Sequence, residues 1–203
     1  MNRRKFIASA AFIGATPWIS GCNKIINWLD EKQDSQFEWT EDVPLNDGQT
    51  IVVKRSARLS ANNIAGGGGG SFNKGMTLEI VSPLPLTSTP MPTVWSDVYV
   101  PLLVDHDAKT QEWFIVATFF HCDGWKNLGE PLLPYTEYRF RQGTWQRQDV
   151  SSGVIGRMSN LYIASRPPKN PHLTAADKRA IVRDRPGTGR RFLTIVSGWQ
   201  GNC

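Results

Sequence analysis

Residues 113–120 read WFIVATFF, a run that is apolar on both faces of an extended chain. Successive side chains of a β-strand point to opposite sides of the sheet, so a strand that is apolar throughout is covered on both sides. We therefore expect this stretch to be a central strand. Residues 98–104 form a second β-rich run, and the polar stretch DHDAKTQ at 105–111 between them predicts a hairpin.

Other short β-rich runs are spread along the rest of the chain, at residues 50–53, 76–81, 135–140, 144–150 and 192–196. Gln142-Gly143 separates two of these runs and is typical of a two-residue hairpin turn. Such a turn sets Phe140 opposite Trp145 as an aromatic cross-strand pair.

One helix is expected late in the chain. Thr174 and Asp177 have the spacing of a capping box, with Asp in place of the usual Glu, and Pro186-Gly187 should end the helix. The glycine run at 66–70 predicts a flexible loop, and the proline-rich residues 82–93 predict an extended crossing. The fold class is therefore mainly β: a single domain, an antiparallel sandwich or bent sheet, with one helix in the C-terminal half.

Length and composition agree with one ordinary domain that has a substantial core. The chain has 203 residues, of which 40% are hydrophobic, and a formal charge of +5. Without the three basic residues of the first segment, 20 basic residues face 18 acidic ones. Nucleic-acid binding needs a dense basic face, so this near-neutral balance argues against a nucleic-acid partner.

The first 22 residues resemble a bacterial export signal. Arg3 and Arg4, followed by Lys-Phe-Ile, resemble a twin-arginine motif, although Asn2 stands where Ser or Thr is usual. Residues 19–22, ISGC, resemble a lipobox, which implies that Cys22 becomes lipidated and is the first residue of the mature chain. The alternatives are an ordinary cleaved signal that ends in Cys, or an uncleaved helix.

These motifs predict the domain organisation and the location. Residues 1–21 are the expected signal peptide, 22–36 the lipidated Cys and a tether, and 37–203 a β-rich periplasmic domain. The acyl chains of a lipoprotein, palmitate among them, provide stable membrane anchoring. Asn23, in place of the Asp that retains lipoproteins in the inner membrane of enteric bacteria, favours the outer membrane.

The remaining cysteines are Cys122 and Cys203. In an oxidising compartment their natural pairing is a disulfide that closes a loop of about 80 residues. The alternatives are a buried free thiol and a nucleophile at Cys122. His121 could not serve as the base of that nucleophile on a strand, because neighbouring side chains alternate between faces.

Asp105, His106 and Asp107 form the sharpest local cluster and are the weak candidates for a metal site. The simpler interpretation is a turn, which Asp favours through its own local hydrogen bonds. No zinc-binding or hydrolase motif accompanies the cluster, so no cofactor is predicted and an enzyme is disfavoured.

Trp125 is the best candidate for an exposed aromatic contact with a ligand, because it lies in a loop-like stretch. The region around it is similar to a family of uncharacterised bacterial proteins, through Trp113–Ala117, Cys122, Trp125, Leu128-Gly129, Pro131, Pro134-Tyr135, Tyr138, Trp145, Ile155-Gly156-Arg157 and Asn160-Leu161. The resemblance implies no activity. Within it, Gly156-Arg157 and Asn160 predict a turn whose polar groups cap neighbouring backbone.

The sequence thus favours a lipid-anchored envelope protein with a structural or interaction role. The alternatives are a periplasmic module that binds cell-wall glycan or an envelope protein, and a metal-dependent hydrolase.

Overall fold

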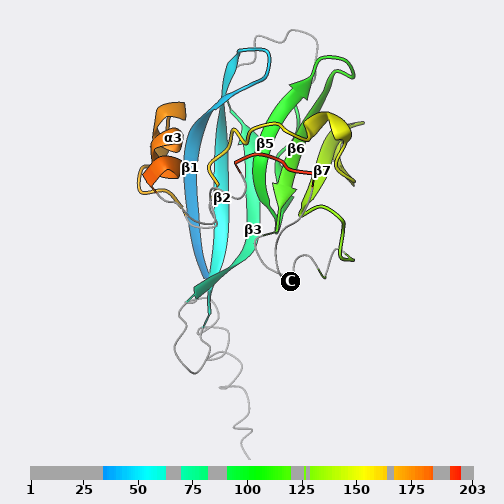
Figure 1. The fold of residues 1–203 in the computed structure, drawn as a ribbon. Helices are drawn as coiled ribbons and strands as arrows, with labels where there is room; N and C mark the ends of the chain where they lie inside the picture. Colours follow the sequence, from blue (N-terminus) through cyan, green and yellow to red (C-terminus); the bar gives the residue numbers. More distant parts are fainter. Residues whose placement is uncertain are drawn as a thin grey trace, which may run out of the picture. The chain divides into compact units, whose positions relative to one another are not determined.

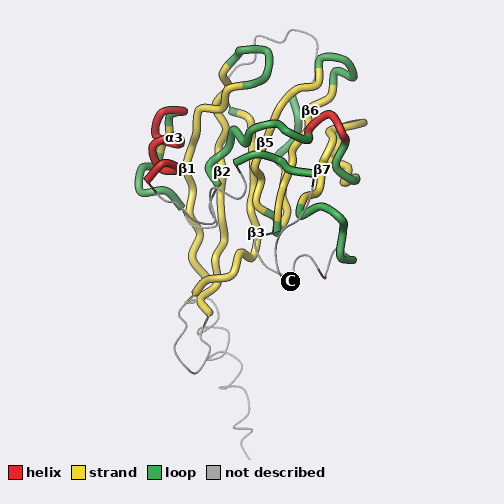
Figure 2. The backbone as a smooth tube through the Cα atoms, in the orientation of Figure 1, coloured by secondary structure: helices red, strands yellow, loops and turns green. Residues whose placement is uncertain are grey.

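The computed structural model describes residues 34–62, 70–81, 91–119, 126, 129–163, 167–184 and 193–197. Within this part of the chain the strands form two sheets (Figures 1 and 2). The first has the order β4-β3-β2-β1-β9, with β1 Asp34–Pro44, β2 Thr50–Asn62, β3 Gly70–Ile80, β4 Trp95–Asp97 and β9 His172–Leu173. The second has the order β5-β6-β7-β8, with β5 Val100–Asp107, β6 Glu112–Thr118, β7 Tyr135–Arg141 and β8 Thr144–Gln148.

All neighbouring strands pair antiparallel except the two-residue β9, which runs parallel to β1. A 3-10 turn, η1 Ser152–Val154, and one α-helix, α3 Ala175–Asp184, complete the regular elements of the described residues. The expected mainly β fold, with a helix in the C-terminal half, is confirmed. None of the described helices is long and apolar enough to cross a membrane.

The strand β6 is central, as its sequence predicts. Trp113, Ile115 and Ala117 point toward the first sheet and share one core with its inward side chains. Phe114 and Val116 point the other way, into a second cluster that includes Val154 and Ile195. Because the segments around residues 154 and 195 cover the outer face of the second sheet, β6 is apolar on both sides.

The β7–β8 hairpin and the helix also agree with their sequence signals. Gln142 and Gly143 have φ values of 51° and 78°, as a two-residue primed turn requires, and the Phe140 and Trp145 rings lie 5.4 Å apart. At the start of α3, Thr174 N donates to Asp177 Oδ2 at 2.9 Å, and Asp177 N donates to Thr174 Oγ1 at 3.1 Å. These reciprocal bonds are the predicted capping box.

Two boundaries differ from the expectations. β1 begins at Asp34, inside the expected tether of residues 22–36. Along β1, the inward-facing Trp39 and Val43 alternate with outward polar residues, but the inward position between them is occupied by Glu41. This charged residue weakens the pattern by which the sequence indicates a strand. The prediction of a final strand at 192–196 is wrong for the described residues there: Thr194 forms only an isolated bridge with Met158. The chain at 193–195 pairs with an irregular segment, 156–159, instead of with a strand.

Candidate functional site

Several predicted site residues lie outside the described residues. These are Arg3 and Arg4 of the export signal, the lipidation site Cys22, the expected disulfide partners Cys122 and Cys203, and the aromatic candidate Trp125. The glycine run is outside as well, except Gly70, which begins β3. These predictions remain predictions.

The cluster Asp105, His106 and Asp107 lies at the end of β5, and the turn itself comprises residues 108–111. The interpretation of the whole cluster as a turn is therefore wrong for Asp105 and His106, because the strand continues to Asp107. Asp107 does form the turn: its Oδ1 accepts from Lys109 N at 2.9 Å and from Thr110 N at 3.4 Å.

Strand alternation separates the three side chains of this cluster. His106 packs against Trp113, with ring centroids 5.2 Å apart, on the side of the core between the sheets. The Asp105 and Asp107 carboxylates lie on the other face, where each is bound by an arginine. The described residues contain no group of three or more His, Cys, Asp or Glu side chains that could hold a metal ion.

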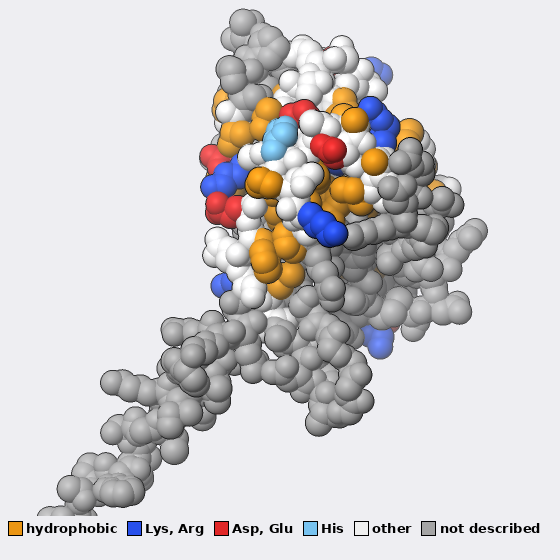
Figure 3. Space-filling model, turned by 90° about the vertical axis from the view of Figure 1, so that its left-hand side faces the viewer, with side chains coloured by type: hydrophobic (Ala, Val, Ile, Leu, Met, Phe, Trp, Pro, Cys, Tyr) orange, Lys and Arg blue, Asp and Glu red, His pale blue; other side chains and the backbone are white. Residues whose placement is uncertain are grey.

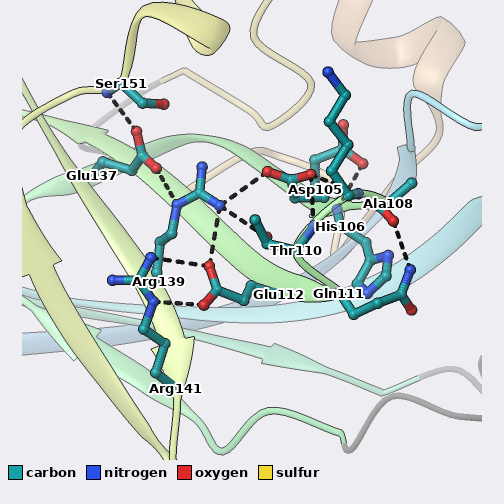
Figure 4. A network of polar contacts seen from close by, with 12 residues as sticks. Asp105, His106, Ala108, Thr110, Gln111, Glu112, Glu137, Arg139, Arg141 and Ser151 are labelled. Atoms are coloured by element: carbon teal, nitrogen blue, oxygen red, sulfur yellow. Dashed lines mark hydrogen bonds and ion pairs between the residues drawn. The ribbon is translucent and has the colours of Figure 1, made fainter.

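Arg139 is the centre of the polar network that binds Asp107 (Figure 4). Its Nη1 donates to Asp107 Oδ2 at 3.0 Å and to Glu112 Oε2 at 3.2 Å, and its Nε donates to Glu137 Oε1 at 2.6 Å. Arg141 donates two hydrogen bonds to Glu112, from Nε to Oε1 at 2.6 Å and from Nη2 to Oε2 at 3.1 Å. The hydrogen bonds from Arg141 lower the pKa of Glu112, so this carboxylate is charged and paired. We interpret the network as a structural one that joins β5, β6 and β7 on the outer face of the second sheet.

A second ionic cluster is buried around Glu41 of β1 and Arg55 of β2. Glu41 and Arg55 are both 0% exposed, and Glu41 Oε1 accepts from Arg55 Nη1 at 2.8 Å and from Trp39 Nε1 at 3.0 Å. The other Glu41 oxygen, Oε2, accepts from Tyr162 N at 2.7 Å and from Lys178 Nζ at 3.2 Å. Burial alone would raise the pKa of Glu41, but the two cations and these hydrogen bonds hold it below its usual value.

Lys178 joins this cluster to the helix α3 and to the segment after η1. Besides Glu41, its Nζ donates to the backbone oxygens of Asp42 at 2.6 Å and of Asn160 at 2.5 Å. An ammonium group has three donors, so Lys178 is fully satisfied by these three acceptors. Lys178 therefore fixes α3 against β1 and against residues 157–163.

The segment fixed in this way forms one wall of a cleft of about 590 Å³. The end of β1 and the start of α3 form the other walls, through Pro44–Asn46 and through Ala175, Lys178 and Arg179. Ligand sites for small molecules typically have volumes of about 300–1,000 Å³. Figure 3 looks onto the face that bears α3 and β1, where hydrophobic and basic side chains lie next to one another.

Asn160 caps backbone, as the sequence predicts, but that backbone belongs to two distant segments, and these bonds hold the cleft wall in place. Its Oδ1 accepts from Val104 N at 3.0 Å, and its Nδ2 donates to the backbone oxygens of Val104 at 2.8 Å and of Pro44 at 3.0 Å. Arg157 acts differently from the prediction. It binds the buried Asp105 carboxylate through Nη2 and lies over the Phe114 ring, 5.3 Å from its centroid, instead of capping backbone.

A second, smaller hollow of about 310 Å³ lies where β4 meets β7 and β8. Its lining residues are Trp95, Ser96, Asp97, Tyr138, Trp145 and Arg147. Tyr138 Oη donates to Asp97 Oδ2 at 2.7 Å, and the Trp95 and Tyr138 rings meet edge to face at 5.3 Å. Burial and the Asp97 carboxylate raise the pKa of Tyr138, so its hydroxyl stays protonated.

Comparisons with protein-family models, with curated proteins and with solved structures gave no match to this chain. Its function is therefore inferred from its own residues.

Sequence reasoning did not identify the cleft or the buried cluster. Glu41 carries a signal only in retrospect: it occupies the inward position of a strand whose neighbours on that face, Trp39 and Val43, are apolar. Arg179 and Met158 lie in unrelated parts of the sequence, and they line the same cleft because Lys178 fixes α3 beside residues 157–163.

Proposed function

We propose that this protein is a lipid-anchored bacterial envelope protein whose β-sandwich domain binds a ligand and does not catalyse a reaction. The resemblance of residues 19–22 to a lipobox supports the anchor at Cys22. The cleft of about 590 Å³ carries the binding role, because it combines an apolar lining with basic side chains and a wall fixed by Asn160 and Lys178.

The arrangement of the carboxylates supports binding over catalysis. Asp105, Asp107, Glu112 and Glu137 each accept a hydrogen bond from an arginine, and Glu41 accepts one from Arg55 and one from Lys178. A general base needs a carboxylate that can take up a proton near neutral pH. The adjacent cations hold the pKa of Glu41, Asp107 and Glu112 below the usual value, so these three carboxylates are poorly suited to this task.

The anchor is tested with Cys22→Ala. Palmitate labelling and membrane fractionation should show a labelled, membrane-bound wild type and an unlabelled variant that is released or retains its signal. Equal labelling of both proteins would contradict the anchor.

The binding role is tested by thiol labelling in the intact envelope. Met158 is 69% exposed beside the cleft, and Lys109 lies exposed in the β5–β6 turn. A bound ligand should slow the labelling of Met158→Cys in the envelope, compared with the purified and washed chain, and should leave Lys109→Cys unchanged. If the ratio of the labelling rate in the envelope to that in the purified chain is the same at both positions, the cleft is not occupied.

The smaller hollow favours a second candidate function, glycan binding. It combines Trp145 and Tyr138 with Asp97 and Arg147, and its volume of about 310 Å³ would suit one small ring. The positive C–H groups of a sugar can lie on the negative face of an aromatic ring. Sedimentation with purified peptidoglycan tests this: Arg147→Gln should weaken binding, and the matched variant Arg58→Gln, exposed on β2, should not.

A further inference from the structure

All charged side chains that line the cleft are basic. They are Arg157, Lys178 and Arg179, and no acidic side chain is among the described lining residues. The charge of Lys178 is compensated by Glu41, and that of Arg157 by Asp105. Arg179 is exposed and has no ion-pair partner among the described residues. The cleft therefore carries one uncompensated positive charge, which favours an anion.

Arg157 is held in a fixed position, and it retains donors that have no partner among the described residues. The Asp105 carboxylate, which accepts from Arg157 Nη2, is itself fixed by His106 N at 2.8 Å and by Asn46 N at 3.3 Å. A guanidinium group has five N–H donors, and a single nitrogen of Arg157 is directed at Asp105. Its side chain is 25% exposed, so the remaining donors can reach a second carboxylate.

Most of the other residues that line the cleft are apolar. Leu45, Leu103 and Leu161 are buried in its floor, Ile163 and Leu193 are half-buried, and Met158 is 69% exposed. A methionine that exposes this much surface is available to cover an apolar ligand, and its flexible side chain adapts to different shapes.

Several backbone groups of the cleft wall already have hydrogen-bond partners. Ser159 N donates to Leu193 O, while Asn160 N and Leu161 N both donate to Leu102 O. The backbone oxygen of Asn160 accepts a hydrogen bond from Lys178 Nζ. A peptide ligand gains much of its affinity from backbone hydrogen bonds, and these groups already have partners. A ligand with an apolar body and a single anionic group requires none of them.

We infer that the cleft binds a small amphipathic carboxylate, with its carboxylate between Arg157 and Arg179 and its hydrocarbon body against Leu161, Ile163 and Met158. The inference rests on the proposed binding role of the cleft and assigns it a ligand class.

The test uses the full chain in nanodiscs of zwitterionic lipid and a photoreactive diazirine analogue of decanoate. Irradiation should label residues 157–163, and decanoate should compete with the label at far lower concentration than decanol. Removing one partly exposed ion pair should raise the decanoate concentration needed for competition by roughly 1.4- to 5-fold in Arg179→Gln. Arg58→Gln removes one exposed positive charge from β2, where Arg58 pairs with Gln36, eight residues along β1 from the cleft residue Pro44, and should have no effect.

Substitutions at Met158 give a second test that leaves the core intact, because this side chain is mostly exposed. Met158→Glu should weaken competition by decanoate, and Met158→Lys should preserve or strengthen it. Equal competition by decanol, labelling outside the cleft, or tighter binding of a leucine-terminated peptide would each overturn the inference. If these fail while the Met158→Cys thiol remains protected in the envelope, the ligand class is wrong and the proposed function stands. If the protection is also lost, both are wrong.

Discussion

Replacing Glu41 by Gln should remove the central anion of the buried cluster while preserving the shape of the side chain. Glu41 accepts hydrogen bonds from four donors, on Trp39, Arg55, Tyr162 and Lys178. A glutamine has one acceptor oxygen, so its NH₂ group would face at least two of these donors. Arg55 would also remain buried without its counter-charge, and its Nε and Nη2 already have no hydrogen-bond partner among the described residues.

Breaking a buried ion pair by removing one partner costs about 3–5 kcal/mol. In a domain of this size, 1 kcal/mol lowers the Tm by about 2–4 °C, which gives a decrease of roughly 6–20 °C. Glu38 provides a matched control on the same strand, because it faces outward and pairs with Lys54 at 3.0 Å, with both side chains about half exposed. Glu38→Gln should cost at most about 1 kcal/mol.

Urea denaturation of the two variants and the wild type, followed by tryptophan fluorescence, measures this difference. We expect a large loss of unfolding free energy for Glu41→Gln and a small one for Glu38→Gln. A loss below about 1 kcal/mol for Glu41→Gln, equal to that of the control, would refute the reasoning that Glu41 stabilises Arg55 and Lys178.

Three further predictions concern pH, the helix cap and the cysteines. Arg55 and Lys178 lower the pKa of Glu41 in the folded state below 4.5. The contribution of Glu41 to the free energy of unfolding is therefore complete above about pH 4.5 and is lost as the pH falls toward the pKa of the folded state. Denaturation curves of wild type and Glu41→Gln should converge in acid, and a constant difference between them would contradict this. Thr174→Ala should cost about 1 kcal/mol in urea, because it removes the cap of α3, and an unchanged midpoint would count against the capping box. Non-reducing mass spectrometry should find Cys122 joined to Cys203, and two freely alkylated thiols in protein taken from the envelope would exclude the disulfide.

Local signals in the sequence were sufficient for much of the fold. The apolar run at 113–120 predicted the central strand β6, Gln142-Gly143 predicted the β7–β8 turn, and Thr174 predicted the start of α3. Each of these features depends on residues that are close in the sequence, so their pattern contains the required information.

The candidate site could not be predicted in this way because it depends on distant pairs. Glu41 and Lys178 are 137 positions apart, and Asp105 and Arg157 are 52 apart. Asp105 and His106 are neighbours in the sequence, and strand alternation places them on opposite faces. Asn160 caps backbone, as its sequence context indicates, but the groups that it caps belong to Val104 and Pro44, which are 56 and 116 positions away.

The central claim is that the cleft beside Arg157 and Arg179 binds an amphipathic carboxylate while the chain is anchored in the envelope. Native mass spectrometry of the full chain, taken from the envelope in a mild detergent, tests this most directly, with Met158→Glu purified in the same way. We expect one bound carboxylic acid per wild-type chain and a strongly reduced bound fraction in the variant. A ligand-free wild type, or equal occupancy in both proteins, would contradict it.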